Sequence, residues 1–401
     1  MSQEDDLLDL FDINLSMDDN KTKMATAKEI KEMVAFIGGL SKWTALPEKV
    51  KEDVIKLLDY RTRVMLSRCS ILDNEIERRV PIQVEHISID GRTNHYDDVT
   101  EESTDAVEVK VTFPQSWKTK ESIIMSNFEL KFLKKDDGSM DIGWQRYYRN
   151  KNPECIRERI ENTDYYEGAV KFFESWLKRC NYGVTRLRVT LDSHPTEPEK
   201  IKRLKNCNEL HISATNEQNV RFWLDLTVHK LDRLSVYITD GLSEDVLSHY
   251  QIQNAHSLSL GKADFTDQLL LDLEAKKFSF ELTSGVTDQG LNAFLKRWAR
   301  GAGVDGFIGC NFRKGRDVEK TVLLDGLNFF PWTKEFEDRH YGGEFTRFNG
   351  TGDRYQVISD INRYSSATLM FADDHVLFSV SGIAATYNGE MHTQYTIPYI
   401  Y

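Results

Sequence analysis

A short strand-like unit recurs along the middle of the chain at a nearly constant interval, and no other feature restricts the possible folds as strongly. Each unit alternates apolar and polar residues, which is the pattern of a strand with one buried face. The units are RLRVTL from residue 186, ELHISA from 209, RLSVYI from 233, SLSLGK from 257, KFSFEL from 277 and GFIGCNF from 306. Their leading apolar residues are Leu187, Leu210, Leu234, Leu258, Phe278 and Phe307, separated by 23, 24, 24, 20 and 29 residues. Helical periodicity between the units predicts one strand and one helix per repeat.

These separations fall within the range of leucine-rich repeats. Repeats of one strand and one helix stack into a curved solenoid with a parallel sheet on its inner face. A doubly wound α/β domain also alternates strands and helices, but it places its ligand at a loop after a strand, commonly a glycine-rich one. No strand-like unit here ends in such a loop, so the near-constant spacing favours the solenoid.

One glycine-rich motif needs a separate interpretation. Gly301, Gly303 and Gly306 form a literal GxGxxG, but a dinucleotide site requires that loop to follow a strand and to open a helix. Here the order is reversed, because the helix-like segment GLNAFLKRWAR, with Thr287 as its expected N-cap, precedes the glycines. We expect the glycines to end that helix in left-handed conformations, and we predict no bound nucleotide.

Strand-like alternation also occurs on both sides of the repeats. The earlier segments are 106–113, 126–135 and 142–148. The later segments are 353–359, 366–373 and 375–382. The first group, with an Asp-Asp-Gly turn signal at 136–138, predicts a small antiparallel sheet. The second group predicts a β cap on the solenoid, whose open end would otherwise expose apolar surface and a free sheet edge.

The segment LPEKVKEDVIKLLDYRTRVMLSRCS, residues 46–70, has helical periodicity twice and begins a helical block that extends to residue 79. Pro47 suits a first helical turn, where its missing N–H costs nothing. The apolar positions are Val50, Val54, Ile55, Leu58, Val64, Met65, Leu66 and Cys69. Helices this short bury little surface by themselves, so either the rest of the chain or another protein must cover these side chains.

The N-terminal segment and the overall charge restrict the partners and the compartment. Residues 1–20 carry seven acidic residues and no basic one, which is unlike a signal peptide. No run of about 18 apolar residues predicts a membrane span, and we expect a cytosolic or nuclear protein. We expect residues 1–24 to be disordered when free, either docking on a basic groove or simply solubilising, and residues 25–37 to form a helix. Without the seven acids the net charge of −12 becomes −5, which argues against nucleic acid as the main partner.

No motif of a catalytic, cofactor or metal site occurs in the sequence. The five cysteines are scattered without a CxxC pair, so we expect them to be free and mostly buried. The ten histidines form no HExxH pattern, and GxSxG, GxxxxGK[ST] and DxDxDG are absent. We therefore predict no enzyme, no cofactor and no metal.

The helical block resembles an F-box. The residues that match the pattern are Leu46, Pro47, Val50, Val54, Leu58, Asp59, Thr62, Arg63, Leu66, Cys69 and Ser70. Two positions depart from it: Lys49 replaces the usual acid, and Ile71-Leu72 replaces the aromatic residue that often follows the Cys-Ser pair. Further along, VTDQGLNAFLKRWARGAG, LLDGLNFFPW and YQVISDINRYSSATLMF are similar to the F-box-associated region of the large nematode F-box family.

This resemblance implies an α+β fold: an N-terminal helical F-box, a small antiparallel β sheet, an irregular leucine-rich-repeat-like β/α solenoid and a C-terminal β cap. The corresponding division of the chain has five parts: an acidic disordered tail at 1–24, the helical F-box at 25–80, the antiparallel β linker domain at 81–150, the solenoid at 151–340 and the β cap at 341–401. The F-box would bind a Skp-type adaptor, and through it a cullin-RING ubiquitin ligase. The residues expected to contact the adaptor are Leu46, Pro47, Val50, Val54, Leu58 and Leu66.

The resemblance further implies a substrate receptor that binds a protein target and performs no bond chemistry itself. The side chains that alternate with the core residues on the repeated strands are the expected target-binding surface. They are Arg186, Arg188, His211, Ser235, Tyr237, Ser259, Ser279 and Glu281. A repeat protein that sequesters its partner without ubiquitin transfer is the alternative. A small-molecule enzyme would require a deep polar pocket, which no sequence feature predicts.

Overall fold

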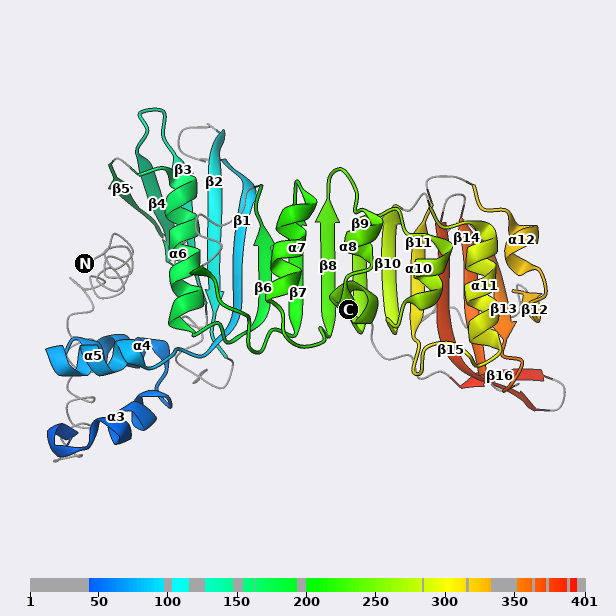
Figure 1. Ribbon diagram of the computed structural model, residues 1–401, viewed down its shortest axis with the longest axis horizontal. Coiled ribbons are helices and arrows are strands. Elements are labelled where there is room, and N and C mark those ends of the chain that lie inside the picture. The colour runs from blue at the N-terminus through cyan, green and yellow to red at the C-terminus, as the bar shows by residue number, and fades with distance from the viewer. Residues whose placement is uncertain are drawn as a thin grey trace. The chain divides into compact units, whose positions relative to one another are not determined.

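The computed structural model describes most of the chain beyond residue 42 (Figure 1). The described ranges are 43–96, 103–114, 127–146, 154–161, 163–192, 200–282, 285–314, 317–332, 352–362, 365–372, 375–387 and 390–394. Two compact units are distinguished, unit 1 from Met1 to Cys207 and unit 2 from Asn208 to Tyr401. The acidic segment 1–24 and the predicted helix 25–37 lie outside the described residues. The five-part division stays a prediction.

The described part of unit 1 begins with a block of short helices, in the segment for which the sequence predicted helices. The elements are a 3₁₀ turn η1 (Trp43–Ala45), α3 (Glu48–Ile55), α4 (Tyr60–Ser67) and α5 (Ile71–Arg79). Asp59 caps α4 by accepting a hydrogen bond from the backbone N–H of Thr62, and Ser70 caps α5 by accepting from Asp73 N–H. Such caps satisfy N–H groups that the helix itself cannot pair. The local sequence therefore sets where each helix begins.

The sheet of unit 1 has the strand order β6-β1-β2-β3-β4-β5. The strands are β1 (Val84–Tyr96), β2 (Ser103–Thr112), β3 (Asn127–Lys134), β4 (Met140–Arg146), β5 (Glu154–Ile160) and β6 (Val184–Thr190). The neighbours from β1 to β5 pair antiparallel, whereas β1 and β6 pair parallel. The prediction of a small antiparallel sheet was therefore wrong: the sheet is larger and mixed. Period-two alternation identifies strands, but it does not identify a partner strand that follows after nearly ninety residues of chain.

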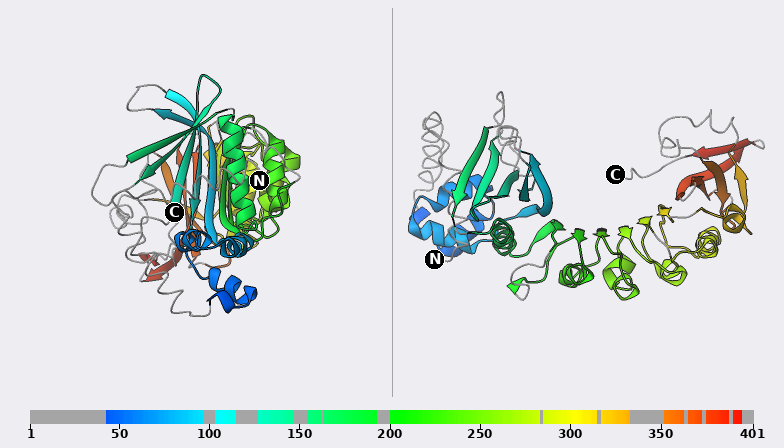
Figure 2. Two further views of the ribbon diagram at one scale, coloured as in Figure 1. Left: turned by 90° about the vertical axis from the view of Figure 1, so that its left-hand side faces the viewer. Right: turned by 90° about the horizontal axis from the view of Figure 1, so that it is seen from above.

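Helix α6 (Tyr165–Arg179) packs on one face of this sheet (Figure 2). Its Trp176 is 1% exposed, and the ring centroid lies 4.9 Å from that of Phe128 on β3. The helix ends in a turn where Asn181 and Tyr182 have positive φ. Trp176 is therefore part of the core between α6 and the sheet.

Unit 2 begins with parallel strands that alternate with helices. The strands are β7 (Glu209–Ala214), β8 (Arg233–Ile238), β9 (Ser257–Lys262), β10 (Lys277–Leu282) and β11 (Gly309–Arg313). The helices are α7 (Glu217–Leu226), α8 (Glu244–Leu247), α9 (Tyr250–Asn254), α10 (Asp267–Asp272), α11 (Asp288–Ala299) and α12 (Lys320–Leu324). Neighbouring strands pair parallel, with the predicted leading residues Leu210, Leu234, Leu258 and Phe278 in register. The helices lie on one side of these strands (Figure 2).

Acidic side chains link successive helices of unit 2. Glu217, the first residue of α7, accepts hydrogen bonds from the backbone N–H and the hydroxyl of Ser243, the N-cap of α8. Asp267, the first residue of α10, binds the same two groups of Thr287, the N-cap of α11. A carboxylate at this position also complements the positive end of its own helix. In both cases a carboxylate stabilises the start of its own helix and accepts hydrogen bonds from the N-cap of the next helix.

The end of α11 agrees with the interpretation of the glycine motif. Thr287 caps the helix by accepting from Gly290 N–H, and Gly301, with φ +71°, follows the helix. A Cβ atom at Gly301 would lie 2.2 Å from Ile361 Cδ1, so both the conformation and the contact require glycine. The motif closes a helix and does not open one.

The C-terminal strands extend the sheet of unit 2. They are β12 (Phe329–Pro331), β13 (Asp353–Ile358), β14 (Ser365–Ala372), β15 (His375–Tyr387) and β16 (Glu390–Gln394). Strand β15 pairs antiparallel with β11 and with β14, so the edge of the parallel strands at β11 is covered. Gln356 is fully buried and satisfied by the hydroxyl groups of Ser366 and Thr368. A covered edge cannot pair with another chain.

Candidate functional site

The helical block has a small core of its own. Its buried members are Trp43, Ile55, Leu66, Ile76 and Val80. Of the six residues expected to contact an adaptor, Leu66 is 2% exposed and belongs to this core. Leu46, Val54 and Leu58 are partly buried against the core. Pro47 is exposed, and Val50 is 42% exposed. The structure therefore separates these six residues into interior, intermediate and surface positions.

The most exposed apolar side chains of the block are residues that the sequence analysis did not select. Leu57, in the turn after α3, is 81% exposed, and Ile71, the first residue of α5, is 82% exposed. Leu72 is 45% exposed. The Leu57-Leu58 doublet could have indicated an exposed leucine, because consecutive residues in a helical turn point in different directions. In the structure Leu58 packs on the core and Leu57 is exposed. We call Val50, Leu57, Ile71 and Leu72 the exposed apolar set.

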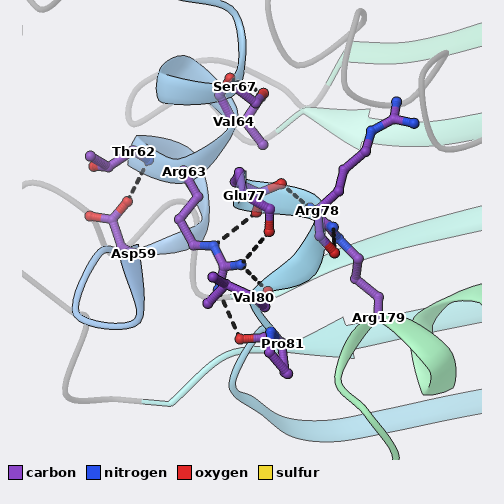
Figure 3. A network of polar contacts seen from close by, with 10 residues as sticks. All are labelled: Asp59, Thr62, Arg63, Val64, Ser67, Glu77, Arg78, Val80, Pro81 and Arg179. Atoms are coloured by element: carbon purple, nitrogen blue, oxygen red, sulfur yellow. Dashed lines mark hydrogen bonds and ion pairs between the residues drawn. The ribbon is translucent and has the colours of Figure 1, made fainter. Parts of the chain in front are cut away.

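A buried arginine fastens α4 to the end of α5 (Figure 3). Arg63 is 1% exposed, and its Nε donates to Glu77 Oε1 at 2.9 Å. Its other nitrogens donate to the backbone carbonyls of Glu77 at 3.3 Å, of Pro81 at 3.0 Å and of Val80. Burial lowers the pKa of the Arg63 guanidinium, and the Glu77 carboxylate opposes this shift. Arg63 therefore supplies hydrogen-bond donors to carbonyls at a helix end, which need partners.

The same carboxylate connects the block to α6. Arg179, in the last turn of α6, donates to Glu77 Oε2 and, at 3.2 Å, to the carbonyl of Arg78. On α4, the Tyr60 ring stacks on Phe113 with centroids 4.9 Å apart and meets Trp176 edge-on at 5.4 Å. The helical block is thus packed on the sheet and α6 as part of unit 1.

A second polar cluster fixes the start of the block. Trp43 Nε1 donates to Asp73 Oδ1 at 3.0 Å, and Ser70 Oγ donates to Asp73 Oδ2 at 2.8 Å. The amine of Lys51, which is 2% exposed, lies 3.9 Å from Asp73 Oδ1 and 5.5 Å from the centre of the Trp43 ring. Opposite charge and the aromatic face together stabilise this buried cation.

The exposed side of the parallel strands in unit 2 presents a row of small polar side chains. The strand register aligns His211, Ser235, Ser259, Ser279 and Asn311 across β7 to β11. Tyr237 lies beside this row, with its hydroxyl 3.1 Å from Ser259 Oγ and its ring centroid 5.5 Å from that of His211. Its ring lies over Gly261, where an added Cβ would approach Tyr237 Cδ1 to 2.9 Å. Six of the expected target-binding residues lie on β7 to β10. Glu281 is exposed, and the other five are half-buried: His211, Ser235, Tyr237, Ser259 and Ser279.

The two remaining expected target-binding residues, Arg186 and Arg188, belong to unit 1. Both lie on β6, on the face of the sheet opposite to α6, and their side chains are 43% and 50% exposed. Arg186 donates a hydrogen bond to Glu85, and the Arg188 guanidinium lies 3.5 Å from the Asp90 carboxylate.

Three further observations concern the described part of the chain. There, no group of three or more His, Cys, Asp or Glu side chains is arranged to hold a metal ion. Burial raises the pKa of the Cys180 thiol to about 11 and that of the Cys310 thiol well above its usual value. Within the same residues, no helix has the length and apolar character needed to cross a membrane.

The comparisons with known proteins give one informative result. No protein-family model and no solved structure matches the chain. The chain is 30% identical, over 391 residues, to an uncharacterized F-box protein of Caenorhabditis elegans. The alignment covers 94% of this chain and 98% of that protein. With the F-box pattern at residues 46–70, this similarity shows that the chain belongs to the F-box protein family.

Proposed function

We propose that this protein is the substrate receptor of a Skp–cullin–F-box ubiquitin ligase. The helical block would bind a Skp-type adaptor, and the strand faces would hold a protein target. Ubiquitin transfer would then follow from proximity, because holding two reactants together replaces a bimolecular encounter. The protein would act without catalysis of its own, in the cytosol or nucleus.

The exposed apolar set is the observation that carries this proposal. Val50, Leu57, Ile71 and Leu72 remain accessible on a block whose core is already closed by Trp43 and its neighbours. Burying a large aliphatic side chain in an interface contributes roughly 1.5–3 kcal/mol before entropic costs. In a member of the F-box family, an adaptor is the partner that would cover such residues.

The repeats support a target-binding role for the second part of the chain. Parallel strands in register, with one helix or helix pair between them, are the features of a leucine-rich-repeat-like solenoid. The hydrogen bonds of Glu217 to Ser243 and of Asp267 to Thr287 add contacts between successive repeats. We interpret unit 2 in this way. The row from His211 to Ser279, together with Tyr237, then provides the exposed strand face on which such proteins bind partners, and the fixed tyrosine ring is a typical hot-spot side chain.

Co-expression with a Skp-type adaptor followed by size-exclusion chromatography tests the proposal. Wild type is expected to elute as a one-to-one complex. The double variant Leu57→Asp with Ile71→Asp is expected to elute alone but folded, because both side chains are more than 80% exposed and their replacement leaves the core intact. The matched control is Val228→Asp, an apolar residue of unit 2 that is 49% exposed. It should bind the adaptor as wild type does.

Two results would contradict the proposal. A folded wild-type protein that ignores the adaptor would leave sequestration of a partner, without ubiquitin transfer, as the function. A double variant that still forms the complex would show that the exposed apolar set is not the adaptor surface. Leu66→Asp is unsuitable for this test, since its charge would enter the core of the block.

A further inference from the structure

The connector between α4 and α5 is exposed along its whole length. Arg68, Cys69 and Ser70 are exposed, and so are Ile71 and Leu72, the first two residues of α5. Ile71 and Leu72 belong to the exposed apolar set, which the proposed function assigns to the adaptor. The hydroxyl of Ser70 therefore lies at the edge of that surface, in a segment that another macromolecule can reach.

The Ser70 hydroxyl is held by Asp73 alone of the residues on α5 that bond to it. Its Oγ donates to Asp73 Oδ2 at 2.8 Å and accepts from the Asp73 N–H at 3.0 Å. Ser67, at the end of α4, differs from it, because it is half-buried and its hydroxyl donates to the carbonyl of Val64 at 2.8 Å. Of these two serines, Ser70 can therefore be modified without disturbing the packing of α4.

A negative charge lies beside this hydroxyl. The Asp73 carboxylate accepts a hydrogen bond from Trp43 Nε1 at 3.0 Å and lies 3.9 Å from the buried Lys51 amine. The pKa of the neighbouring Cys69 thiol is raised by burial and by the charge of Asp73. A second anion at Ser70 would therefore be repelled by Asp73.

We propose that Ser70 is a phosphorylation site and that its phosphate releases the adaptor from the helical block. A protein kinase would supply ATP: Ser70 Oγ attacks the γ-phosphorus, the bond to ADP breaks, and the hydroxyl proton passes to a carboxylate of the kinase. Asp73, once its bonds to Ser70 open, and the exposed Glu75 follow the serine, and this charge pattern suits an acid-directed kinase. This inference rests on the proposed function, since it names a regulation of the same adaptor surface.

The phosphate would change the surface of the block while α5 persists. A phosphoserine carries nearly two negative charges, and its ester oxygen can no longer donate to Asp73. At the start of α5 a dianion is favourable, because the helix dipole attracts it, and this attraction offsets the repulsion by Asp73. Next to Ile71, which is 82% exposed, the same dianion must lose its water whenever an adaptor covers the exposed apolar set. An unpaired charge in an apolar interface strongly opposes association.

Isothermal titration calorimetry with a Skp-type adaptor measures this effect on the full-length chain. Phosphoserine is placed at position 70 by codon reassignment, and circular dichroism checks that the fold persists. The adaptor should bind this protein roughly tenfold or more weakly than the unmodified chain, and phosphatase treatment should restore the affinity. Ser70→Ala removes the cap without adding charge, so it should bind within about threefold of wild type.

Phosphoserine at position 248 is the matched control. Ser248 is an exposed residue of unit 2 that follows α8, and its hydroxyl donates to the carbonyl of Asp245 at 2.9 Å. The modification there adds the same charge to a serine outside the helical block. Adaptor affinity should not change.

Mass spectrometry tests the modification itself. The folded full-length protein is incubated with an acid-directed serine kinase and ATP, and the phosphorylated residues are mapped on its peptides. We expect phosphate on Ser70, and we expect protection of Ser70 when the adaptor is bound before the kinase is added.

Three outcomes would overturn the inference. These are an unphosphorylated Ser70 after the kinase reaction, an adaptor affinity that phosphoserine at position 70 leaves unchanged, or an equal loss of affinity in Ser70→Ala. The last would assign the effect to the helix cap. An unmodified wild type that ignores the adaptor would instead overturn the proposed function, whereas mass spectrometry would still decide whether Ser70 is a phosphorylation site. The two failures are thereby distinguished.

Discussion

Replacing Arg63 by alanine should destabilise unit 1 strongly. The change removes a buried guanidinium that bonds the Glu77 side chain and three backbone carbonyls, of Glu77, Val80 and Pro81. Glu77 is 2% exposed and, among the residues that the structure describes, would keep Arg179 as its charged partner. Removing one member of a buried ion pair costs about 3–5 kcal/mol. For a domain of this size, that corresponds to a melting temperature lower by on the order of 10 °C.

Differential scanning calorimetry and guanidinium unfolding, followed by tryptophan fluorescence, measure this effect. Arg79→Ala is the matched control in the same block, because the Arg79–Glu48 pair at 2.8 Å is exposed on both sides and should contribute little. The double variant Arg63→Ala with Glu77→Ala should lose less than the sum of the two single variants, since the pair is coupled. A loss below about 1 kcal/mol for Arg63→Ala would refute the reasoning, because the buried pair would then count no more than a surface pair.

Three further predictions concern a glycine, a histidine and two cysteines. Gly290→Ala would place Cβ 1.9 Å from Asp267 Oδ1, so thermal unfolding should show a loss of about 1–3 kcal/mol, despite the higher helix propensity of alanine. If the variant were more stable instead, the contact with Asp267 would be wrong. Because the folded pKa of His86 is about 4 against 6.5 for a free histidine, the unfolded state binds more protons between these values. Stability should therefore fall as the pH is lowered from 6.5 towards 4, and urea unfolding of His86→Gln should show a smaller fall; an equal fall would contradict the assignment. In peptide-resolved alkylation of the native protein, exposed Cys69 should react before buried Cys180, and the reverse order would contradict their burial.

The sequence by itself determined the elements and many of their ends. The units ELHISA, RLSVYI, SLSLGK and KFSFEL became strands β7 to β10 with the predicted bounds, because one buried face imposes a period of two on each. Thr287 capped α11 as predicted, and Gly301 followed its end. These features depend on neighbours within a few residues, which a local pattern records. The relative in Caenorhabditis elegans confirms that the chain belongs to the F-box protein family.

Only the tertiary structure decided which strands pair and which apolar residues stay outside. The parallel partner of β1 is β6, and this made the predicted small antiparallel sheet a larger mixed one. Leu66 and Leu57 have the same side chain in the same block, yet Leu66 is 2% exposed and Leu57 is 81% exposed. Arg63 matched a motif position, but its role follows from carbonyls 14 to 18 residues away. The physical reason is common to all three: burial and pairing are set by contacts between distant segments, whereas periodicity describes one segment at a time.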